Sequence, residues 1–430
     1  MAMATLISPV ADQCRSAKRA SRALAQVDTA VKDAALAAIA DSLEARLQEI
    51  LAANERDMQA GRQAGIGAAL LDRLRLDEAR VRAIAQAVRE IAALADPVGE
   101  VIEGRRLANG LDVRKVRVPL GVVAVVYEAR PNVTIDAAAL CLKSGNAIVL
   151  RGSSSAVHSN AALAQIAAEG AQAGGLPPGC VNLVAGGGRE ELVQLATQSD
   201  AVDLIIPRGG EGLKEALQAV ATVPVIYAAS GNCHVYVDAS ADLDQAEAIV
   251  LNSKTQRPGV CNAAETVLIH SQCAPLFLPR LLRSLAAAGV LVRGDERALA
   301  MAAVDGGPAP NLMLEQASEE DWASEYLALT LAVGVVDSLD EAIEHISRYG
   351  SGHSEAIVAR DGVAARAFQQ GVDAACVYVN ASTRFTDGGE FGMGAEIGNS
   401  TQKLHARGPI GLRELCTFKY LVEGDGHVRA

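Results

Sequence analysis

One cysteine of this sequence stands where it could act as a nucleophile. Cys261 lies in the polar segment "KTQRPGVCN", between a helical pattern and a β-rich run, and Lys254 and Arg257 lie within seven residues of it. Nearby positive charge lowers the pKa of a thiol and raises its thiolate fraction. A free cysteine in a cytosolic protein is also commonly a small buried apolar residue. The segment alone therefore leaves both a nucleophile and a buried side chain open.

Two further segments have the composition of an anion-binding turn. In "RGSSSA", Arg151, Ser153 and Ser154 follow a predicted strand, and ligands bind at the carboxyl ends of strands in open parallel sheets. An arginine followed by hydroxyl groups, with no acidic residue, suits a ribose 2′-phosphate, although the serines could equally cap a helix. The segment "AGGGREE" around Gly187 could present backbone N–H groups to a phosphate, or it could be an ordinary strand-to-helix turn.

The composition of the whole chain limits the class of protein. A length of 430 residues allows two or three domains, and 50% apolar with 21% charged residues suits a soluble globular enzyme. The net charge of -12 disfavours nucleic acid and anionic membranes as partners. We find no run long enough to span a membrane and no secretion signal, so we expect a cytoplasmic protein. The eight cysteines show neither a C-x-x-C pair nor zinc-ligand spacing, which predicts reduced thiols and no metal site.

The pattern of the first half predicts an α/β domain. Residues 11–95 have the apolar spacing of amphipathic helices, and residues 99–118 resemble a β-hairpin that leads into a buried strand at 121–127. Strands and helices then alternate, as in βαβ units with a parallel sheet. They are predicted at 146–151, 156–173, 181–184, 189–198, 201–206, 210–220, 223–227 and 234–238. Residues 121–238 should thus form one doubly wound domain of the nucleotide-binding type.

The second half predicts another α/β unit after a helix at 242–255. Its strands and helices are expected at 265–270, 275–289, 331–337, 339–347, 355–360 and 375–380, with a last strand at 416–424. Residues 382–415 are rich in glycine and lack periodicity. A loop of that length in a compact domain is usually functional.

Several long segments resemble those of a known family. They are "VPLGVVAVVYEARPNVTIDAAALCLKSGNAIVLRG", "IIPRGGEGL", "CHVYVD", "KTQRPGVCNAAETVLIH", "RYGSGHSEAIVA" and "VNASTRFTDGGEFGMGAEIGNSTQKLHARGPIGL", and they span most of the chain. On these segments the chain resembles the aldehyde dehydrogenase superfamily, and within it the enzymes that reduce L-glutamyl 5-phosphate to L-glutamate 5-semialdehyde in proline synthesis.

This resemblance implies an aldehyde dehydrogenase-like α/β fold with two doubly wound parallel-sheet domains and an oligomerisation element made of the β-hairpin and the C-terminal strand. The implied divisions are 1–98 with 119–255 for NADP binding, 256–405 for catalysis, and 99–118 with 406–430 for assembly into a homo-oligomer.

The resemblance also assigns the chemistry. The Cys261 thiolate would attack the acyl carbon, expel phosphate and leave a thioester that NADPH reduces, while the Cys261 N–H and Asn132 stabilise the oxyanion. The residues implied for NADPH are Arg151, Ser153, Ser154, Gly187, Gly209 and Glu325, and those for the substrate are Arg130, Arg257, His353 and Arg384. Surface or ion-pair roles stay open for the three substrate arginines, and a buried structural role stays open for the histidine.

One departure from ordinary aldehyde dehydrogenases distinguishes an acyl-phosphate reductase from a hydrolytic aldehyde dehydrogenase. Their "ELGG"-type motif carries a glutamate that activates water, whereas the matching stretch "YAASGNCHVYV" has Ala228 and Ala229. A thioester that water does not cleave survives to meet hydride or phosphate, which disfavours a hydrolytic aldehyde dehydrogenase. A non-catalytic protein that binds a nucleotide or RNA is disfavoured by the net acidity and the intact cysteine segment. Because acyl phosphates hydrolyse and cyclise readily, handover from the preceding enzyme, glutamate 5-kinase, would protect the intermediate, but nothing in the sequence demonstrates contact between the two enzymes.

Overall fold

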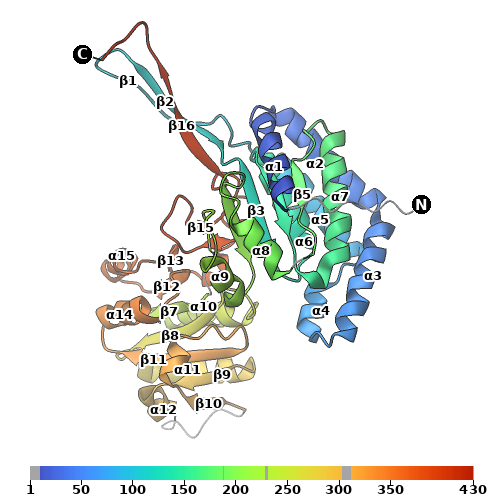
Figure 1. The fold of residues 1–430 in the computed structure, drawn as a ribbon. Coiled ribbons are helices and arrows are strands. Elements are labelled where there is room, and N and C mark those ends of the chain that lie inside the picture. Colours follow the sequence, from blue (N-terminus) through green and yellow to red (C-terminus); the bar gives the residue numbers. More distant parts are fainter. Residues whose placement is uncertain (1–9, 187, 228–230, 303–310, 430) are drawn as a thin grey trace. The chain divides into compact units, whose positions relative to one another are not determined.

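A computed structural model describes residues 10–186, 188–227, 231–302 and 311–429 (Figure 1). Contacts divide the chain into two units. The first comprises Met1–Ala228, Gly392–Gly398 and Ile410–Ala430, and the second comprises Ala229–Phe391 and Asn399–Pro409. Each unit contains a parallel sheet with helices, which confirms the predicted α/β class.

The sheet of the first unit has the order β5-β4-β3-β6. Its strands are β3 (Val122–Tyr127), β4 (Ala147–Arg151), β5 (Val181–Leu183) and β6 (Leu204–Arg208), and all pairs are parallel. Every residue of β3 and β4 is buried, as expected when helices cover both faces of a parallel sheet.

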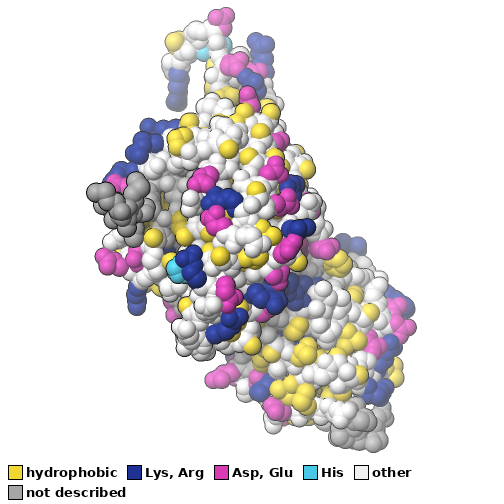
Figure 2. Space-filling view, turned by 90° about the vertical axis from the view of Figure 1, so that its right-hand side faces the viewer, with side chains coloured by type: hydrophobic (Ala, Val, Ile, Leu, Met, Phe, Trp, Pro, Cys, Tyr) yellow, Lys and Arg dark blue, Asp and Glu magenta, His cyan; other side chains and the backbone are white. Residues whose placement is uncertain are grey.

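The helices of the first unit are α1 (Val10–Leu24), α2 (Thr29–Ala45), α3 (Leu47–Gln63), α4 (Ala68–Leu74), α5 (Glu78–Ala93), α6 (Asn132–Lys143), α7 (Val157–Ala173), α8 (Arg189–Ala196) and α9 (Glu211–Gln218). Helices α1, α6 and α7 contact the strands of this sheet, and α2 and α3 pack on α7. Gly174, after α7, lets that helix approach α2, because a Cβ on Gly174 would lie 2.8 Å from the Ala35 Cβ. Acidic and basic side chains are interspersed over the surface that Figure 2 shows.

A three-stranded antiparallel ribbon completes the first unit. Strand β1 (Val101–Arg106) pairs with β2 (Asp112–Pro119), and β2 pairs with β16 (Cys416–Glu423), so that Cys416 lies opposite Pro119 and Glu423 opposite Asp112. The predicted hairpin and last strand are therefore confirmed as elements, and they lie side by side in Figure 1.

The sheet of the second unit has the order β10-β9-β11-β8-β7-β12-β13, with parallel pairs throughout. Its strands are β7 (Cys233–Val237), β8 (Ala264–His270), β9 (Leu291–Gly294), β10 (Met313–Gln316), β11 (Thr330–Val336), β12 (Ser354–Val358) and β13 (Cys376–Val379). Its helices are α10 (Leu243–Thr255), α11 (Ala274–Ala287), α12 (Glu296–Ala302), α13 (Glu319–Trp322), α14 (Leu339–Tyr349) and α15 (Gly362–Gly371). Strands β14 (Asn399–Ser400) and β15 (Gly408–Pro409) form a separate two-stranded sheet.

Three predictions from the sequence were wrong. Strand β7 pairs with β8 and β12, so residues 121–238 do not form one domain, and α10 also belongs to the second unit rather than to the range 119–255. The predicted strand at 223–227 is reduced to a single bridge between Ile205 and Val225, next to Pro224, which has no N–H to donate.

Two global features bear on the sequence expectations. Within the described ranges, no helix combines the length and the apolar character needed to cross a membrane. All eight cysteines carry reduced thiols, and Cys261 is partly exposed whereas the other seven are buried. Three residues used in the sequence analysis, Gly187, Ala228 and Ala229, lie outside the described residues.

Candidate active site

A pocket of about 530 Å³ lies at the carboxyl ends of the parallel strands in the first unit. Glu128 follows β3 and Arg151 ends β4, while α8 and α9 supply the other walls. The lining residues are Glu128, Arg151, Arg189, Leu192, Gly212, Leu213, Glu215, Ala216 and Ala219. Open parallel sheets bind nucleotides at this edge, so the pocket is the candidate nucleotide site.

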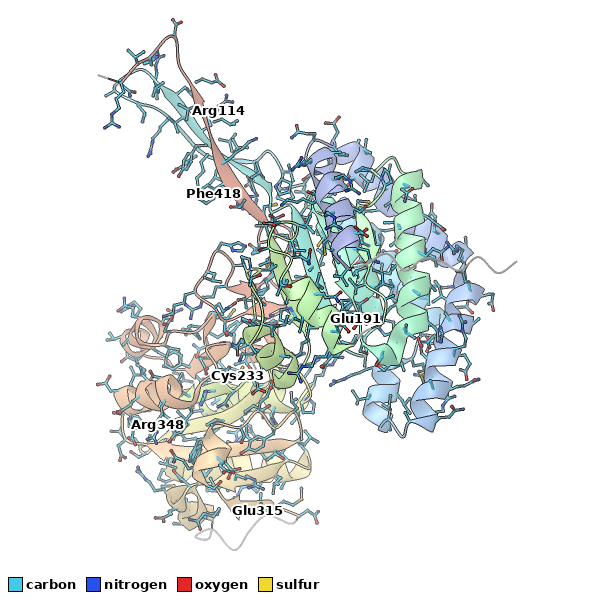
Figure 3. The ribbon with its side chains drawn as sticks, viewed as in Figure 1. Arg114, Glu191, Cys233, Glu315, Arg348 and Phe418 are labelled. Carbon is cyan, nitrogen blue, oxygen red and sulfur yellow. The ribbon has the colours of Figure 1, made fainter. Side chains whose placement is uncertain are left out.

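Arg151 is held firmly inside this pocket. Its side chain is 7% exposed, and Nη2 donates to the Gly188 carbonyl oxygen at 2.6 Å. Burial lowers the pKa of the Arg151 guanidinium, while the carboxylates of Glu191 and Glu128 oppose that shift. Sequence reasoning missed both carboxylates; Glu191 is labelled on α8 in Figure 3. The pocket thus offers an arginine that suits phosphate and a carboxylate that suits a ribose hydroxyl.

The other residues predicted for the cofactor in this unit occupy adjoining turns. Ser153 accepts the backbone N–H of Ala129 at 3.3 Å, and the exposed Ser154 begins the short helix η1 (Ser154–Ala156). Gly209 follows β6, and a Cβ there would lie 2.8 Å from the Glu128 side chain. A side chain at position 209 would therefore displace Glu128.

Two residues predicted for substrate and oxyanion lie where α6 begins. Asn132 is the first residue of α6, and its Nδ2 donates to the Asp136 carboxylate at 2.9 Å. Arg130 is exposed two residues earlier. One donor of the Asn132 amide is thus engaged within its own helix, and that bond fixes the orientation of the amide.

Cys261 lies in the second unit, between the end of α10 and the start of β8. Its backbone packs directly against Gly231, where a Cβ would lie 2.5 Å from the Cys261 Cα. The Gly231 N–H in turn donates to the Glu325 carboxylate at 2.7 Å. Glu325, predicted to contact the cofactor, therefore also fixes the segment that supports Cys261.

Two of the predicted substrate arginines share the surroundings of Cys261. Burial lowers the pKa of the Arg384 guanidinium, the positive charge of Arg257 lowers it further, and negative charge at Cys261 opposes both effects. Arg384 is thus within electrostatic range of both Arg257 and Cys261. Arg257 is exposed and Arg384 is half-buried, so this part of the surface can receive an anion.

His353 lies beneath this loop and is not at the surface. Cys233 lies on β7 and is labelled in Figure 3. Its thiol donates to the Cys261 carbonyl oxygen at 3.2 Å, and its sulfur lies 4.0 Å from His353 Nδ1. His353 is 1% exposed, its Nδ1 shares a hydrogen bond of 2.8 Å with the Ser354 hydroxyl, and burial lowers its pKa to about 4. A neutral, buried ring supports the structural alternative rather than contact with substrate.

A buried ion pair anchors the helix that precedes Cys261. Lys254, in the last turn of α10, donates to Glu265 on β8, and both side chains are fully buried. Burial raises the pKa of Glu265 to about 7, and burial also lowers the pKa of Lys254. The Lys254 charge is therefore held by Glu265 below the loop. Its influence on Cys261, expected from sequence spacing, is correspondingly weakened.

The structure sorts the predicted residues between the two units. Cys261, Arg257, Arg384, Glu325 and His353 belong to the second unit, whereas Asn132, Arg130, Arg151, Ser153, Ser154 and Gly209 belong to the first. Sequence reasoning missed the contacts of Gly231 and Cys233 with the backbone of Cys261. Both residues lie in the stretch "YAASGNCHVYV", but their position in the sequence does not show which residues they contact.

Comparisons with known proteins agree on one family. The family model described as "Aldehyde dehydrogenase family" matches residues 8–305. Gamma-glutamyl phosphate reductase of Thermobifida fusca is 55% identical over 413 residues, which cover 96% of this chain and 97% of that protein. The protein of the same name from Kineococcus radiotolerans is 56% identical over 416 residues, with 97% and 95% covered.

Solved structures give the same result. The crystal structure of gamma-glutamyl phosphate reductase from Thermotoga maritima has a TM-score of 0.95 and 43% identity, and covers 98% of this chain and 100% of that one. An acetylating aldehyde dehydrogenase from Geobacillus thermoglucosidasius, at 19% identity and a TM-score of 0.67, covers 98% and 97% and shares the fold.

Proposed function

The chain belongs to the aldehyde dehydrogenase family, and we propose that it reduces L-glutamyl 5-phosphate to L-glutamate 5-semialdehyde in proline biosynthesis, with Cys261 as the nucleophile. The names of its relatives, at 55–56% identity over nearly the whole chain, supply the substrate. The observation that carries the mechanism is the single partly exposed cysteine, Cys261, within electrostatic range of Arg384, which also interacts with Arg257.

The proposed chemistry begins with attack by the thiolate. The Cys261 sulfur forms a bond to the acyl carbon while the bond from that carbon to the phosphate oxygen breaks, and phosphate leaves with the electron pair. Arg384 and Arg257 are suited to receive the leaving phosphate, because guanidinium groups bind phosphate through charged hydrogen bonds. The backbone N–H of Cys261 is our first candidate for the oxyanion donor, and Asn132 is the second.

Aldehyde dehydrogenase family proteins use nicotinamide cofactors, and we propose NADPH for this chain. The cofactor, when bound, supplies the hydride that reduces the thioester. We assign the nucleotide to the pocket between α8 and α9, which Arg151 and Glu128 line. Ser153 and Ser154 follow Arg151 in the adjoining turn, and Gly209 leaves space beside Glu128. Collapse of the thiohemiacetal on Cys261 then releases the semialdehyde and restores the thiolate.

The lack of a glutamate base for hydrolysis supports phosphate, rather than water, as the group that cleaves the thioester in the reverse reaction. The chain has Ala228 and Ala229 where a hydrolytic aldehyde dehydrogenase carries its glutamate. With no carboxylate there to activate water, phosphate is the nucleophile that resolves the thioester in the reverse direction.

Assembly and supply of substrate complete the proposal. Phe418, Tyr420 and Val422 lie on one face of β16 and are 45%, 53% and 56% exposed, which supports the ribbon as the element that joins subunits of a homo-oligomer. We further propose a cytoplasmic location and handover of the labile acyl phosphate from glutamate 5-kinase. Both follow from the biosynthetic role of the relatives.

The reverse reaction tests the function. Purified protein is given NADP⁺ and glutamate 5-semialdehyde, with and without inorganic phosphate, and NADPH is followed by absorbance for wild type and Cys261→Ala. We expect continuous NADPH formation in the wild type with phosphate, and none in the variant. Equal rates with and without phosphate would make water the acceptor and overturn the acyl-phosphate mechanism.

A further inference from the structure

The residue after the nucleophile is bound from several directions. The Asn262 side chain is buried, and its Nδ2 donates to the carbonyl oxygens of Thr386 at 2.9 Å and Arg384 at 3.3 Å. Its Oδ1 accepts a hydrogen bond from Arg384 Nη1. The Asn262 backbone carbonyl accepts from the Thr383 hydroxyl at 2.7 Å.

These bonds use both N–H groups of the amide and one of the two acceptor positions of its oxygen. Two N–H groups meet two backbone carbonyls while the oxygen meets a guanidinium, and a carboxylate or an alkyl group at this position could not do both. Arg384 is held at a second point by Gln256, whose Oε1 accepts from Arg384 Nε at 2.9 Å. The Arg384 guanidinium is therefore held by two hydrogen bonds, and the acceptor of one of them is Asn262, the residue that follows Cys261.

We infer that Asn262 is a positioning residue that holds the Arg384 guanidinium beside Cys261, and that through Arg384 it stabilises the Cys261 thiolate and the phosphate exchanged there. This inference rests on the proposed function for the role of the thiolate. In this role the Asn262 amide acts through its hydrogen bond to Arg384. Its effect should therefore disappear when Arg384 is absent.

The fold around Asn262 has other anchors, so its amide can be removed without losing the loop. The Thr383 hydroxyl still bonds to the backbone of residue 262, and the Ser382 hydroxyl shares a hydrogen bond of 2.9 Å with Ser253 on α10. Thr383→Val is the matched control, because it removes a hydrogen bond from the same loop to Asn262 and leaves the contact between Asn262 and Arg384 in place.

The test measures the rate of Cys261 alkylation by iodoacetamide against pH, by mass spectrometry of the Cys261 peptide, in the full chain. The proteins are wild type, Asn262→Ala, Arg384→Ala, the double variant and Thr383→Val. We expect Asn262→Ala to react about tenfold more slowly at pH 7, through a rise of about one unit in the thiol pKa. Arg384→Ala should show at least the same loss, the double variant should match Arg384→Ala, and Thr383→Val should match wild type.

Two outcomes overturn the inference. One is an alkylation profile of Asn262→Ala that equals wild type, and the other is a double variant that loses the product of the two single effects, which would make the residues independent. The thermal midpoint of Asn262→Ala, compared with that of Thr383→Val, excludes general unfolding as the cause. Because alkylation needs no substrate, it succeeds or fails separately from the phosphate-dependent assay, in which Asn262→Ala should also raise the KM for phosphate.

Discussion

Gly231 supports Cys261 by backbone contact alone: a Cβ on Gly231 would lie 2.5 Å from the Cys261 Cα and overlap its carbonyl group. The backbone of Cys261 thus packs against a residue, Gly231, that cannot carry a side chain. The Gly231 N–H donates to the Glu325 carboxylate. The position of Cys261 therefore depends on a glycine and a glutamate that are distant from it in sequence.

Gly231→Ala should therefore displace the nucleophile. We expect kcat to fall by about a hundredfold, because a shift of about 1 Å in a reacting group costs that much. Gly259→Ala is the control in the same loop, since a Cβ there meets nothing nearer than the Leu327 carbonyl oxygen at 3.7 Å. Steady-state kinetics of both variants checks this, and equal activity in the two would contradict the account.

Buried His353 should make the folded state sensitive to acid. Burial lowers its pKa from 6.5 to about 4, so between these values the unfolded chain binds a proton that the folded chain does not. The free energy of unfolding should then fall, as pH decreases, by about 1.4 kcal/mol per pH unit for this ring. Above pH 6.5 the ring is neutral in both the folded and the unfolded state, so this loss of stability is absent there.

His353→Asn should remove that share of the pH dependence, while the exposed His158→Asn should not. Denaturant unfolding at several pH values between 4 and 7 compares the slopes. His345, whose pKa burial lowers to about 3, keeps part of the acid sensitivity in both variants. Identical slopes for wild type and His353→Asn would show that the ring is not buried neutral.

Much of the fold followed from local pattern, and the errors came from pairing between distant segments. The apolar pattern of residues 233–237 fits a buried strand in either sheet. Only the pairing with β8 and β12 places this strand in the second unit. Strands β9 and β10 have four residues each and lie at one edge of the sheet, too short for a periodic signal.

The proposed preference for NADPH over NADH can be tested with a single substitution. Ser154 is exposed at the start of η1, near Arg151, and a carboxylate there would repel a ribose 2′-phosphate. Ser154→Glu should raise the KM for NADPH by about tenfold and leave that for NADH nearly unchanged. Kinetics with both cofactors tests this, with Ser155→Ala as the neighbouring control. A proportional loss with both cofactors would refute the assignment of this turn.

The ribbon should determine the oligomeric state. Tyr420→Glu, in the middle of the exposed apolar face of β16, should lower the mass of the particle in sedimentation velocity, because a charge would be buried at the contact. Leu276→Glu on α11 is the control, since that side chain is 76% exposed. A wild-type monomer, or an unchanged mass for Tyr420→Glu, would contradict the proposal.

The sequence supplied candidate residues for the site but not their arrangement. The loop composition and the family-like segment pointed to Cys261, and Arg384 lies within electrostatic range of Cys261 and of Arg257. The sequence placed Lys254 among its activating charges, but Lys254 bonds to Glu265 inside the core. His353 is likewise buried, and the spacing of residues in the sequence does not show that it is buried.

The most direct test of the mechanism is a rapid-mixing measurement of NADPH formation from glutamate 5-semialdehyde and NADP⁺ without phosphate. If Cys261 forms a thioester that water does not cleave, wild type gives one stoichiometric burst per active subunit and then stops, and added phosphate restarts turnover. Cys261→Ala gives no burst. Continuous turnover without phosphate, or a burst in Cys261→Ala, would contradict the account.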